Sequence, residues 1–380
     1  MSRDKEQRNE GIVPARDGEL RKYSADLIQR GLDLTQELRQ SDTSVDVDQQ
    51  TTEIVTKKRG AWRCLHTLNG HSDFVYSVAI SPNGKTIVSG SKDRNIKVWD
   101  LQTGQMQRTL EGHSSLVKSV AISPDGQTIV SGSLDSTIKM WDLHTGQMQR
   151  SLKGHSWQVH SVAISPNGQT IVSGGLDIGG SKDIKVWDLH TGQLIRTLKG
   201  HLSLVTSVAI SPDGQTIVSD SRDKTLKVWN LHTGSLIRNL NGYSAASGYS
   251  VAISPDGKKI VSGGTRVSMI SSPDKGKTLV SRSVGNNTIK VWDLMTGEQI
   301  NTFKGHSNSV DSVAISPDAQ TLVSGSSDKT IKVWNFQTGQ LLCSLKGHSW
   351  IVTSVAISPN GETFVSSSLD KTIKIWGLSL

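Results

Sequence analysis

Short extended segments separated by turn sequences make up most of this chain. From Val117 onward, apolar and polar residues alternate, as the period-two patterning of a strand requires, and the run ends in the turn sequence Ser-Pro-Asp-Gly at 123–126. β-Branched residues then mark the next strand. The pattern predicts four short antiparallel strands in this unit, at 117–122, 128–131, 137–141 and 148–152.

The same unit recurs along the chain, and two markers show it. Both markers advance in steps of 42 residues, except at two insertions of 4 and 21 residues. A Gly-His dipeptide, or Gly-Tyr in one copy, ends at His71, His113, His155, His201, Tyr243, His306 and His348, and a tryptophan recurs at Trp99, Trp141, Trp187, Trp229, Trp292, Trp334 and Trp376. A four-stranded sheet of this size cannot bury its faces alone, so we expect seven sheets stacked around an axis.

The two ends of the repeat array complement each other. The last unit stops just after Trp376 and has only three strands, whereas the segment 62–68 before the first Gly-His matches a fourth strand. An N-terminal strand that completes the last sheet would close the array into a ring and remove its open edges. We therefore predict an all-β fold, a seven-bladed β-propeller closed by an N-terminal strand.

The first 60 residues have a different pattern. Leu20, Tyr23, Leu27, Leu34 and Leu38 recur at helical spacing, which predicts a short amphipathic helix. The residues that follow are polar and show no period, as is typical of a linker. The expected organisation is an N-terminal segment with the helix at 1–40, a polar linker at 41–60 and the propeller at 61–380.

The repeats resemble those of the WD-repeat β-propeller family over residues 61–380, as a uniform array of the bacterial kind. In the first unit the histidine of Gly-His is followed 18 residues later by Ser-Gly-Ser-x-Asp-x-x-Ile-Lys-Val-Trp-Asp, and seven copies of such a unit at a regular period are highly specific. The resemblance implies that a His, Ser, Asp and Trp in each blade form a structural hydrogen-bond network. The matching sets are His71, Ser89, Asp93, Trp99; His113, Ser131, Asp135, Trp141; His201, Ser219, Asp223, Trp229; His306, Ser324, Asp328, Trp334; and His348, Ser366, Asp370, Trp376.

Ser, His and Asp also build hydrolase triads. A catalytic site is needed once, however, and this trio occurs at the same spacing in five units with no Gly-x-Ser-x-Gly turn. The Gly-Lys-Thr sequences at 84–86 and 276–278 lack the earlier glycine of a phosphate-binding loop. We therefore expect a non-enzymatic protein with no cofactor and no metal site.

Two units depart from the pattern. In the third, four extra residues separate Asp177 from the tryptophan, and Asp183 competes for the network position. In the fifth, Tyr243 replaces the histidine, Asn286 stands where Asp is expected, and 21 extra residues include a partial duplication. We expect the fifth blade to be the weakest. Its insertion is either a protruding hairpin that grips a partner or a tolerated addition.

The charge and composition narrow the range of expected functions and locations further. The net charge is +8, but one lysine per unit spreads that charge around the ring, so nucleic-acid binding is not expected. The N-terminus has charges where a signal peptide needs an apolar run, no apolar stretch is long enough to span a membrane, and Cys64 and Cys343 form no metal or redox spacing. The expected location is the cytoplasm, and the oligomeric state is left open.

The residues around the innermost strands vary between units while the frame repeats. In resembling propellers partners dock at these positions, so the resemblance implies a binding face here for one or more proteins or peptides. The mixture of aromatic, aliphatic and charged groups fits a protein interface. The alternatives are a propeller that binds a small molecule or glycan, and a regulatory module for a separate effector. The candidate face consists of Phe74, Tyr76, Lys92, Leu116, Lys118, Leu134, Trp157, His160, Leu204, Arg222, Tyr249, Asp311, Trp350 and Ile351.

Overall fold

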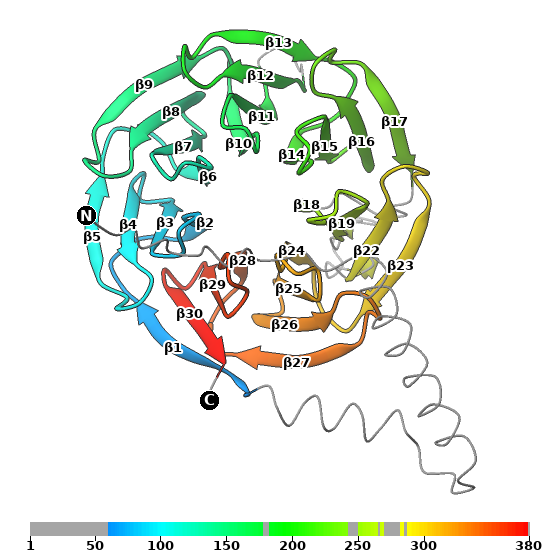
Figure 1. Ribbon diagram of the computed structural model, residues 1–380. Helices are drawn as coiled ribbons and strands as arrows, with labels where there is room; N and C mark the ends of the chain where they lie inside the picture. Colours follow the sequence, from blue (N-terminus) through cyan, green and yellow to red (C-terminus); the bar gives the residue numbers. More distant parts are fainter. Residues whose placement is uncertain are drawn as a thin grey trace, which may run out of the picture. The chain divides into compact units, whose positions relative to one another are not determined.

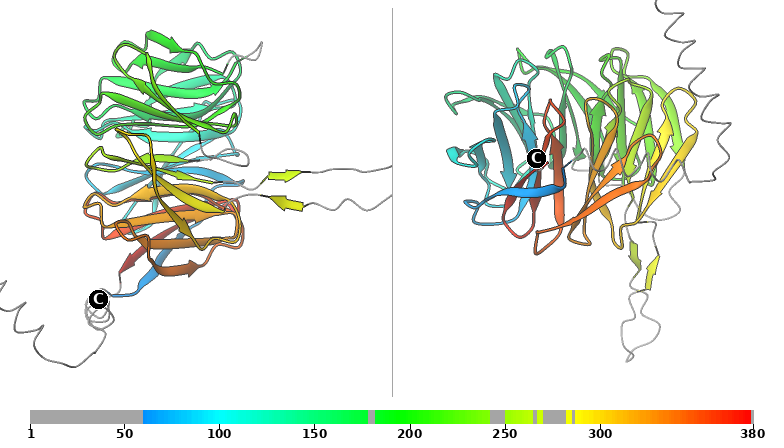
Figure 2. Two further views of the ribbon diagram at one scale, coloured as in Figure 1. Left: turned by 90° about the vertical axis from the view of Figure 1, so that its right-hand side faces the viewer. Right: turned by 60° about the horizontal axis from the view of Figure 1, so that its bottom comes forward.

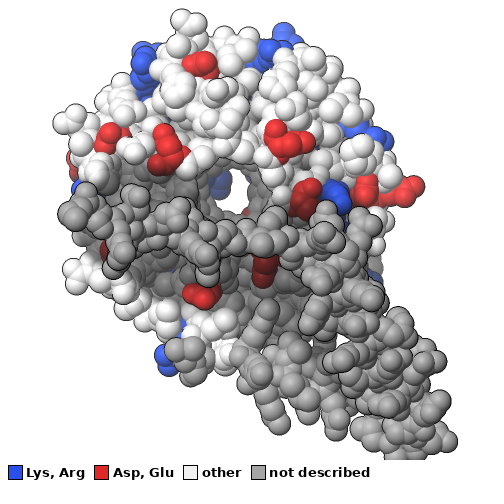
Figure 3. All heavy atoms as spheres, viewed as in Figure 1, with Lys and Arg blue, Asp and Glu red and all other residues white. Residues whose placement is uncertain are grey.

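Seven four-stranded antiparallel sheets form a ring (Figure 1), and the space-filling view shows an open central channel (Figure 3). The computed structural model describes residues 60–177, 182–241, 250–264, 267–269, 282–284 and 287–378. The prediction of an all-β seven-bladed propeller is confirmed. The predicted N-terminal helix and linker lie outside the described residues. No helix long and apolar enough to cross a membrane occurs in the described ranges.

Each blade has four strands, which we call a, b, c and d from the channel outward. The first is β2 (Val75–Ile80), β3 (Thr86–Ser91), β4 (Ile96–Asp100), β5 (Met106–Leu110), and the second is β6 (Val117–Ile122), β7 (Thr128–Ser133), β8 (Thr137–Asp142), β9 (Met148–Lys153). The third is β10 (Gln158–Ile164), β11 (Thr170–Leu176), β12 (Ile184–Asp188), β13 (Leu194–Leu198), and the fourth is β14 (Val205–Ile210), β15 (Thr216–Ser221), β16 (Thr225–Asn230), β17 (Leu236–Asn241). The fifth is β18 (Val251–Ile253), β19 (Lys259–Gly263), β22 (Thr288–Asp293), β23 (Gln299–Lys304), and the sixth is β24 (Val310–Ile315), β25 (Thr321–Ser326), β26 (Thr330–Asn335), β27 (Leu341–Lys346). The seventh is β28 (Val352–Ile357), β29 (Thr363–Ser368), β30 (Ile373–Leu378) and β1 (Trp62–Leu68).

The seventh blade closes the ring, because β1 supplies its outermost strand. β1 runs antiparallel to β30, and the pairing begins at Trp62 opposite Leu378. The Trp62 ring packs against the Phe364 ring of β29, with ring centroids 4.8 Å apart. The closure predicted from the complementary ends of the array is therefore present in the structure.

The core of the ring lies between neighbouring blades. Val88 and Val98 of the first blade pack in one buried cluster with Val117, Ile129 and Trp141 of the second. Equivalent clusters join the other blades. Each sheet thus buries its apolar residues against the next sheet, which explains why one unit could not fold alone.

A glycine on strand b allows this close approach. A Cβ added to Gly132 would lie 2.7 Å from Cγ1 of Val159 on the next blade, and Gly90 stands in the same relation to Val117. A bulky side chain does not fit in that space unless the blades move apart, although the seventh blade accommodates the small Ser367 at this position. The fourth blade has the buried Asp220 at this position.

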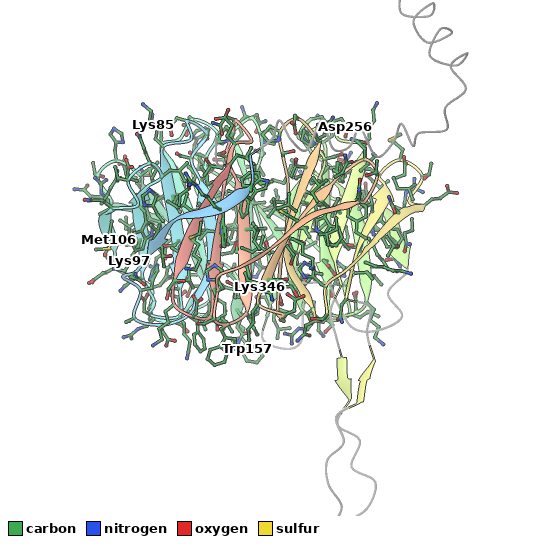
Figure 4. All side chains as sticks on the ribbon, turned by 90° about the horizontal axis from the view of Figure 1, so that it is seen from below. Lys85, Lys97, Met106, Trp157, Asp256 and Lys346 are labelled. Atoms are coloured by element: carbon green, nitrogen blue, oxygen red, sulfur yellow. The ribbon has the colours of Figure 1, made fainter. Side chains whose placement is uncertain are left out.

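The channel opens on two faces, which carry different turns. The a–b turns of Lys85 and Asp256 lie on one face, called here the Lys85 face, and Trp157 lies on the opposite face, called the Trp157 face (Figure 4). The d–a connections and the b–c turns belong to the Trp157 face. Every predicted binding position within the described ranges belongs to these connections or to the neighbouring residues of strand a.

The insertion of the fifth blade includes two further strands. β20 (Val267–Met269) pairs with β21 (Arg282–Val284) in a separate two-stranded sheet within the b–c connection. Figure 2 shows these two strands projecting away from the ring, and Figure 4 shows them on the side of Trp157. One alternative from the sequence, a protruding hairpin, therefore describes its form, whereas its role stays a prediction.

Candidate functional site

A buried hydrogen-bond network holds each regular blade together. In the second blade, Nδ1 of His113 lies 2.7 Å from Oδ2 of Asp135, and its Nε2 lies 2.8 Å from Oγ of Ser131. Nε1 of Trp141 donates to the same Oγ at 2.9 Å. Because the carboxylate can only accept, the histidine donates from Nδ1, and its Nε2 accepts the serine proton. The network ties strands b and c to the d–a connection.

The same four-residue geometry recurs in the sets that begin at His71, His201, His306 and His348. Their corresponding distances are 2.7–2.9 Å. In the second blade the side chains of His113 and Asp135 are 0% and 5% exposed. Such complete burial makes the sets part of the frame and keeps them away from any ligand on the surface.

The aspartates of these sets are held in their charged form. Burial on its own would raise the pKa of Asp135, but hydrogen bonds from His113 and Thr137 outweigh it, and the pKa lies well below its ordinary value. Asp223, Asp328 and Asp370 shift in the same direction for the same reasons. The carboxylate therefore stays an acceptor at any physiological pH.

The third blade retains part of the network. Nε2 of His155 and Nε1 of Trp187 both lie within hydrogen-bond distance of Oγ of Ser173, at 2.8 and 2.9 Å. Asp177 takes the acidic position, but its Oδ1 is 3.3 Å from Nδ1 of His155, and this nitrogen has no hydrogen-bond partner among the described residues. Asp177 also lies 3.6 Å from Nζ of Lys185. Of the two competing aspartates, the structure places Asp177 beside the histidine.

The fifth blade keeps one described contact of this kind. Nε1 of Trp292 donates to Oγ of Ser262 at 3.3 Å, which is longer than in the other blades. Tyr243 and Asn286, which replace the histidine and the aspartate in the sequence, lie outside the described residues.

A second, wholly repeated feature lines the channel. In each blade one serine, on strand a or in the fifth blade just before it, accepts a hydrogen bond from a valine N–H of the next blade, at 3.0–3.3 Å. The serine of the seventh blade accepts from the first blade. We call these residues the serine ring: Ser77, Ser119, Ser161, Ser207, Ser250, Ser312 and Ser354. Strand patterning identified them only as strand residues, although their invariance at one position of all seven units was a signal.

The residue before each ring serine varies along the chain: it is Tyr, Lys, His, Thr, Tyr, Asp and Thr in the seven successive units. At the Trp157 face the described side chains of this set border a cavity of about 450 Å³ at the channel mouth, called here the mouth cavity. It brings together six of the fourteen candidate binding residues. They are Tyr76, Lys118, His160, Arg222, Asp311 and Ile351.

Two cations shape the electrostatics of the mouth cavity. Nζ of Lys118 lies 4.0 Å from the centre of the Tyr76 ring, a cation–π contact. Burial lowers the pKa of Lys118 to about 8, and Arg222 adds to that effect while Asp311 opposes it. Within the described ranges, neither Lys118 nor Arg222 forms an ion pair with a carboxylate.

The other titratable groups of the cavity are shifted toward their neutral forms. Burial raises the pKa of Asp311 to about 7, although Ser327 donates a hydrogen bond to its Oδ2 at 2.6 Å. Burial, with the charges of Lys118 and Arg222, lowers the pKa of His160 to about 3. Near neutral pH the histidine is therefore uncharged, and the cavity has a positive balance.

Aromatic side chains lie beside the cavity on the same face. The rings of Phe74 and Trp350 meet edge to face with centroids 5.6 Å apart, and Nζ of Lys92 lies 4.7 Å from the Phe74 ring centre. Lys92 also pairs with Asp73 at 3.3 Å. Trp350 is 50% exposed despite these contacts, so much of the indole is open to a partner.

The remaining candidate residues that the structure describes are not among those that line the cavity. Trp157 is 48% exposed on its own blade, whereas Leu204 is only 7% exposed and offers little surface. Leu116 and Leu134 are half-buried and linked through their backbones at 3.1 Å. Tyr249 lies outside the described residues. Leu202, which is 83% exposed, was not among the predicted binding residues; a leucine where the other units have serine after the Gly-His or Gly-Tyr dipeptide was the available signal.

Comparison with known families agrees with the geometry. The family described as WD domain, G-beta repeat matches the chain seven times, at residues 62–100, 104–142, 146–188, 192–230, 234–293, 297–335 and 339–377. The chain belongs to this family. Each WD repeat begins with strand d of one blade and ends with strand c of the next, so neighbouring blades share every repeat.

The WD repeats also relate the chain to named proteins, over short stretches. It is 51% identical over 45 residues to the transcriptional repressor rco-1 of Neurospora crassa, covering 12% of this chain and 8% of that protein. It is 36% identical over 80 residues to the protein Notchless of Drosophila melanogaster, covering 20% and 16%. The match to the pre-mRNA-splicing factor prp46 of Emericella nidulans is 39% over 46 residues, covering 12% and 10%. The chain spans less than a fifth of the length of these relatives.

The lysine of each WD repeat is packed against its own blade. Six of the seven strand-c lysines are only 7–9% exposed. Nζ of Lys97 donates to Oγ1 of Thr109 at 2.8 Å, and Nζ of Lys332 donates to Oγ of Ser344 at 3.0 Å, both on strand d. The charge of these lysines is therefore largely covered. The positive net charge of the chain does not by itself indicate a basic surface.

The opposite mouth of the propeller carries acidic groups. Figure 3 views the Lys85 face and shows acidic side chains around the open channel. In the a–b turns of four WD repeats an aspartate follows the proline. These residues are Asp125, Asp213, Asp256 and Asp318. The two ends of the channel thus differ in the sign of their charge.

Proposed function

We propose that this WD-repeat propeller is a non-catalytic platform that binds a protein or peptide on its Trp157 face, with part of the partner entering the mouth cavity. One observation carries the proposal. The position before the ring serine is Tyr76, Lys118, His160, Thr206, Tyr249, Asp311 or Thr353 in successive units, while the serine itself never changes. A repeated frame thus presents one composite, asymmetric surface.

Exposed aromatic groups support a protein partner. Trp157 and Trp350 are each about half exposed on the face that surrounds the cavity. Tryptophan is enriched among the residues that contribute most to protein–protein binding energy, because a large rigid ring buries much area at low entropic cost. A central cavity with aromatic groups around it is suited to anchor a side chain and the segment that carries it.

A ligand-binding propeller of the lectin kind would present the same pocket in each blade. Here the equivalent positions differ, and the described cavity at this face is shared by all the blades that surround the channel. This asymmetry favours one partner per ring over several identical small ligands.

Site-specific photo-crosslinking tests the proposal. Trp350 would be replaced by the photoreactive benzoylphenylalanine in the full chain expressed in its own cells, and a second protein would carry the same residue in place of Lys85 on the opposite face. We expect a discrete protein adduct from Trp350 that is absent from Lys85 and is lost when Tyr76→Ala is added. Equal adducts from both positions, or none from Trp350, would contradict a docking role for this face.

A further inference from the structure

We infer that the partner segment that enters the mouth cavity is acidic, and that it presents an aspartate or glutamate carboxylate to Lys118 and Arg222. The inference rests on the proposed function and specifies its partner. It draws on three features of the described residues: two cations without carboxylate partners, a ring of hydroxyl donors, and an acidic far mouth.

The two cations come from different blades and converge on one cavity. Lys118 lies on strand a of the second blade and Arg222 in the b–c turn of the fourth, and both line the same space. In the described part of the chain neither makes an ion pair. Placing like charges near each other in a partly buried site is unfavourable unless an anion joins them. A carboxylate between them would supply that anion.

The serine ring adds donors at the base of the same cavity. Ser119, Ser161 and Ser207 line it, as do three further ring serines. The oxygen of each accepts the valine N–H of the next blade, and no described protein atom accepts its hydroxyl proton. A hydroxyl that already accepts one hydrogen bond is left to donate, so the ring offers protons to an acceptor such as a carboxylate.

The charge at the two mouths gives the channel a direction. An acidic segment would meet Asp256 and the aspartates of three other a–b turns at the Lys85 face, where like charges repel it. At the Trp157 face it would meet Lys118 and Arg222 instead. A basic segment would be repelled at the cavity by these same two groups, so charge complementarity selects an acid that enters from the Trp157 side.

The protonation of side chains in the mouth cavity supports the inference, and it makes the pH dependence of binding a measurable test. Its titratable groups are Tyr76, Lys118, His160, Arg222 and Asp311. An incoming carboxylate favours the charged form of Lys118 and the protonated form of Asp311, so both of their pKa values rise on binding. The complex then holds more protons than the free protein near neutrality, and affinity increases as the pH falls through about 8 and about 7. His160 stays neutral in this range, because its pKa is about 3.

The experiment uses labelled homopeptides as probes and fluorescence anisotropy on the full chain. Hexaglutamate, hexaglutamine and hexalysine would be titrated at pH 6, 7 and 8. We expect hexaglutamate alone to bind, more tightly at pH 6 than at pH 8. The Lys118→Gln and Arg222→Gln proteins should each bind it at least about tenfold more weakly. Asp311→Asn should bind it more tightly, and the loss of pH dependence should be largest in the Lys118 and Asp311 variants.

Lys85→Gln is the matched control, because it removes the same charge on the opposite face. It should bind as the unmodified protein does, and unfolding midpoints in urea would show that all variants are folded. Binding of hexalysine, or hexaglutamate binding that Lys118→Gln and Arg222→Gln leave unchanged, would overturn the inference. Tighter binding of an oligodeoxythymidine through the same two residues would also overturn it. A Trp350 adduct without hexaglutamate binding would refute the acidic partner but leave the docking face intact.

Discussion

The second and fifth blades have nearly the same strand-c sequence but different surroundings. In the second, the b–c turn is tight, strand a (β6) is six residues long, and the buried network is complete. In the fifth, a long insertion replaces that turn, and strand a (β18) is three residues long. Nevertheless strands b and c keep one register: Ile260 pairs with Trp292, as Ile129 pairs with Trp141.

The difference separates two roles in the blade. Register follows from the strand sequences and from packing against the neighbouring blades, because it survives the loss of the short turn. The hydrogen-bond network adds stability and fixes the d–a connection where it is complete. If so, changes that disturb blade packing should have the largest effects, and changes to single hydrogen bonds should matter more in the second blade than in the fifth.

The largest effect is expected at the junction between blades. Gly132→Asp would place a charged side chain where even a Cβ lies 2.7 Å from Cγ1 of Val159, so we expect a loss of about 3 kcal/mol or more in unfolding free energy. Asp220 occupies the corresponding place in the fourth blade, and the residue that aligns with Val159 in the sequence of the next unit is Gly248 rather than valine. The isosteric Asp220→Asn should cost about 1 kcal/mol or less. Urea unfolding followed by tryptophan fluorescence measures both, and equal losses would contradict the argument.

The centre of the network should show the next largest difference. Ser131→Ala removes the oxygen that both Nε1 of Trp141 and Nε2 of His113 contact, so two buried groups lose a partner, at about 2–3 kcal/mol. Ser262→Ala removes a longer bond to Trp292 in the fifth blade, and we expect about 1 kcal/mol. Denaturation midpoints measure the pair. Ser131→Cys is a size-matched control that should lie between the wild type and alanine. A larger loss from Ser262→Ala would refute the proposed division of roles.

Acid should act on the second blade through its aspartate. The folded pKa of Asp135 is lowered, so its stabilising contribution is fully present above the unfolded value of 3.8 and is lost as the pH falls below it. Asp135→Asn should therefore cost about 1–3 kcal/mol at pH 7 and progressively less toward pH 3. Unfolding free energy measured across that range checks the sign. A cost that does not shrink with acid would mean that the charge of Asp135 is not what stabilises the blade.

The serine ring should give the smallest effects. Ser119→Ala removes the acceptor for Val162 N–H, and Ser207→Ala removes that for Val251 N–H, each at 3.1 Å. We expect about 0.5–1.5 kcal/mol in each case. Amide hydrogen exchange would show faster exchange at the one valine that loses its partner. Ser119→Thr, which keeps the hydroxyl, should leave exchange of Val162 near the wild-type rate. Unchanged exchange at both valines would show that these bonds contribute nothing.

Most of the fold was predictable from the sequence, because the repeats encode it locally. The turn chemistry and β-branched runs set the strands, and the position of Trp62 to Leu68 before the first Gly-His indicated how the ring closes. The five complete His, Ser, Asp and Trp sets could be assigned by position alone, and the structure brings their atoms within hydrogen-bond distance.

The site was less predictable, because it depends on distances between units. Strand patterning placed Lys118 and Arg222 near the channel but could not show that they share one cavity with Asp311. It also assigned Leu204 to the surface, whereas packing buries it. Likewise, the sequence showed one lysine on strand c of each unit but could not show that the ammonium group of Lys97 reaches strand d.

The pairing of β1 with β30 has a mechanical consequence. The two strands are antiparallel, so the start of β1 at Trp62 lies beside the end of β30 at Leu378. A force that pulls these two ends apart would load the hydrogen bonds one after another, as in a zipper, rather than all at once in shear. The seventh blade would therefore open at low tension, while the same strand pair resists thermal fluctuations as a cooperative unit.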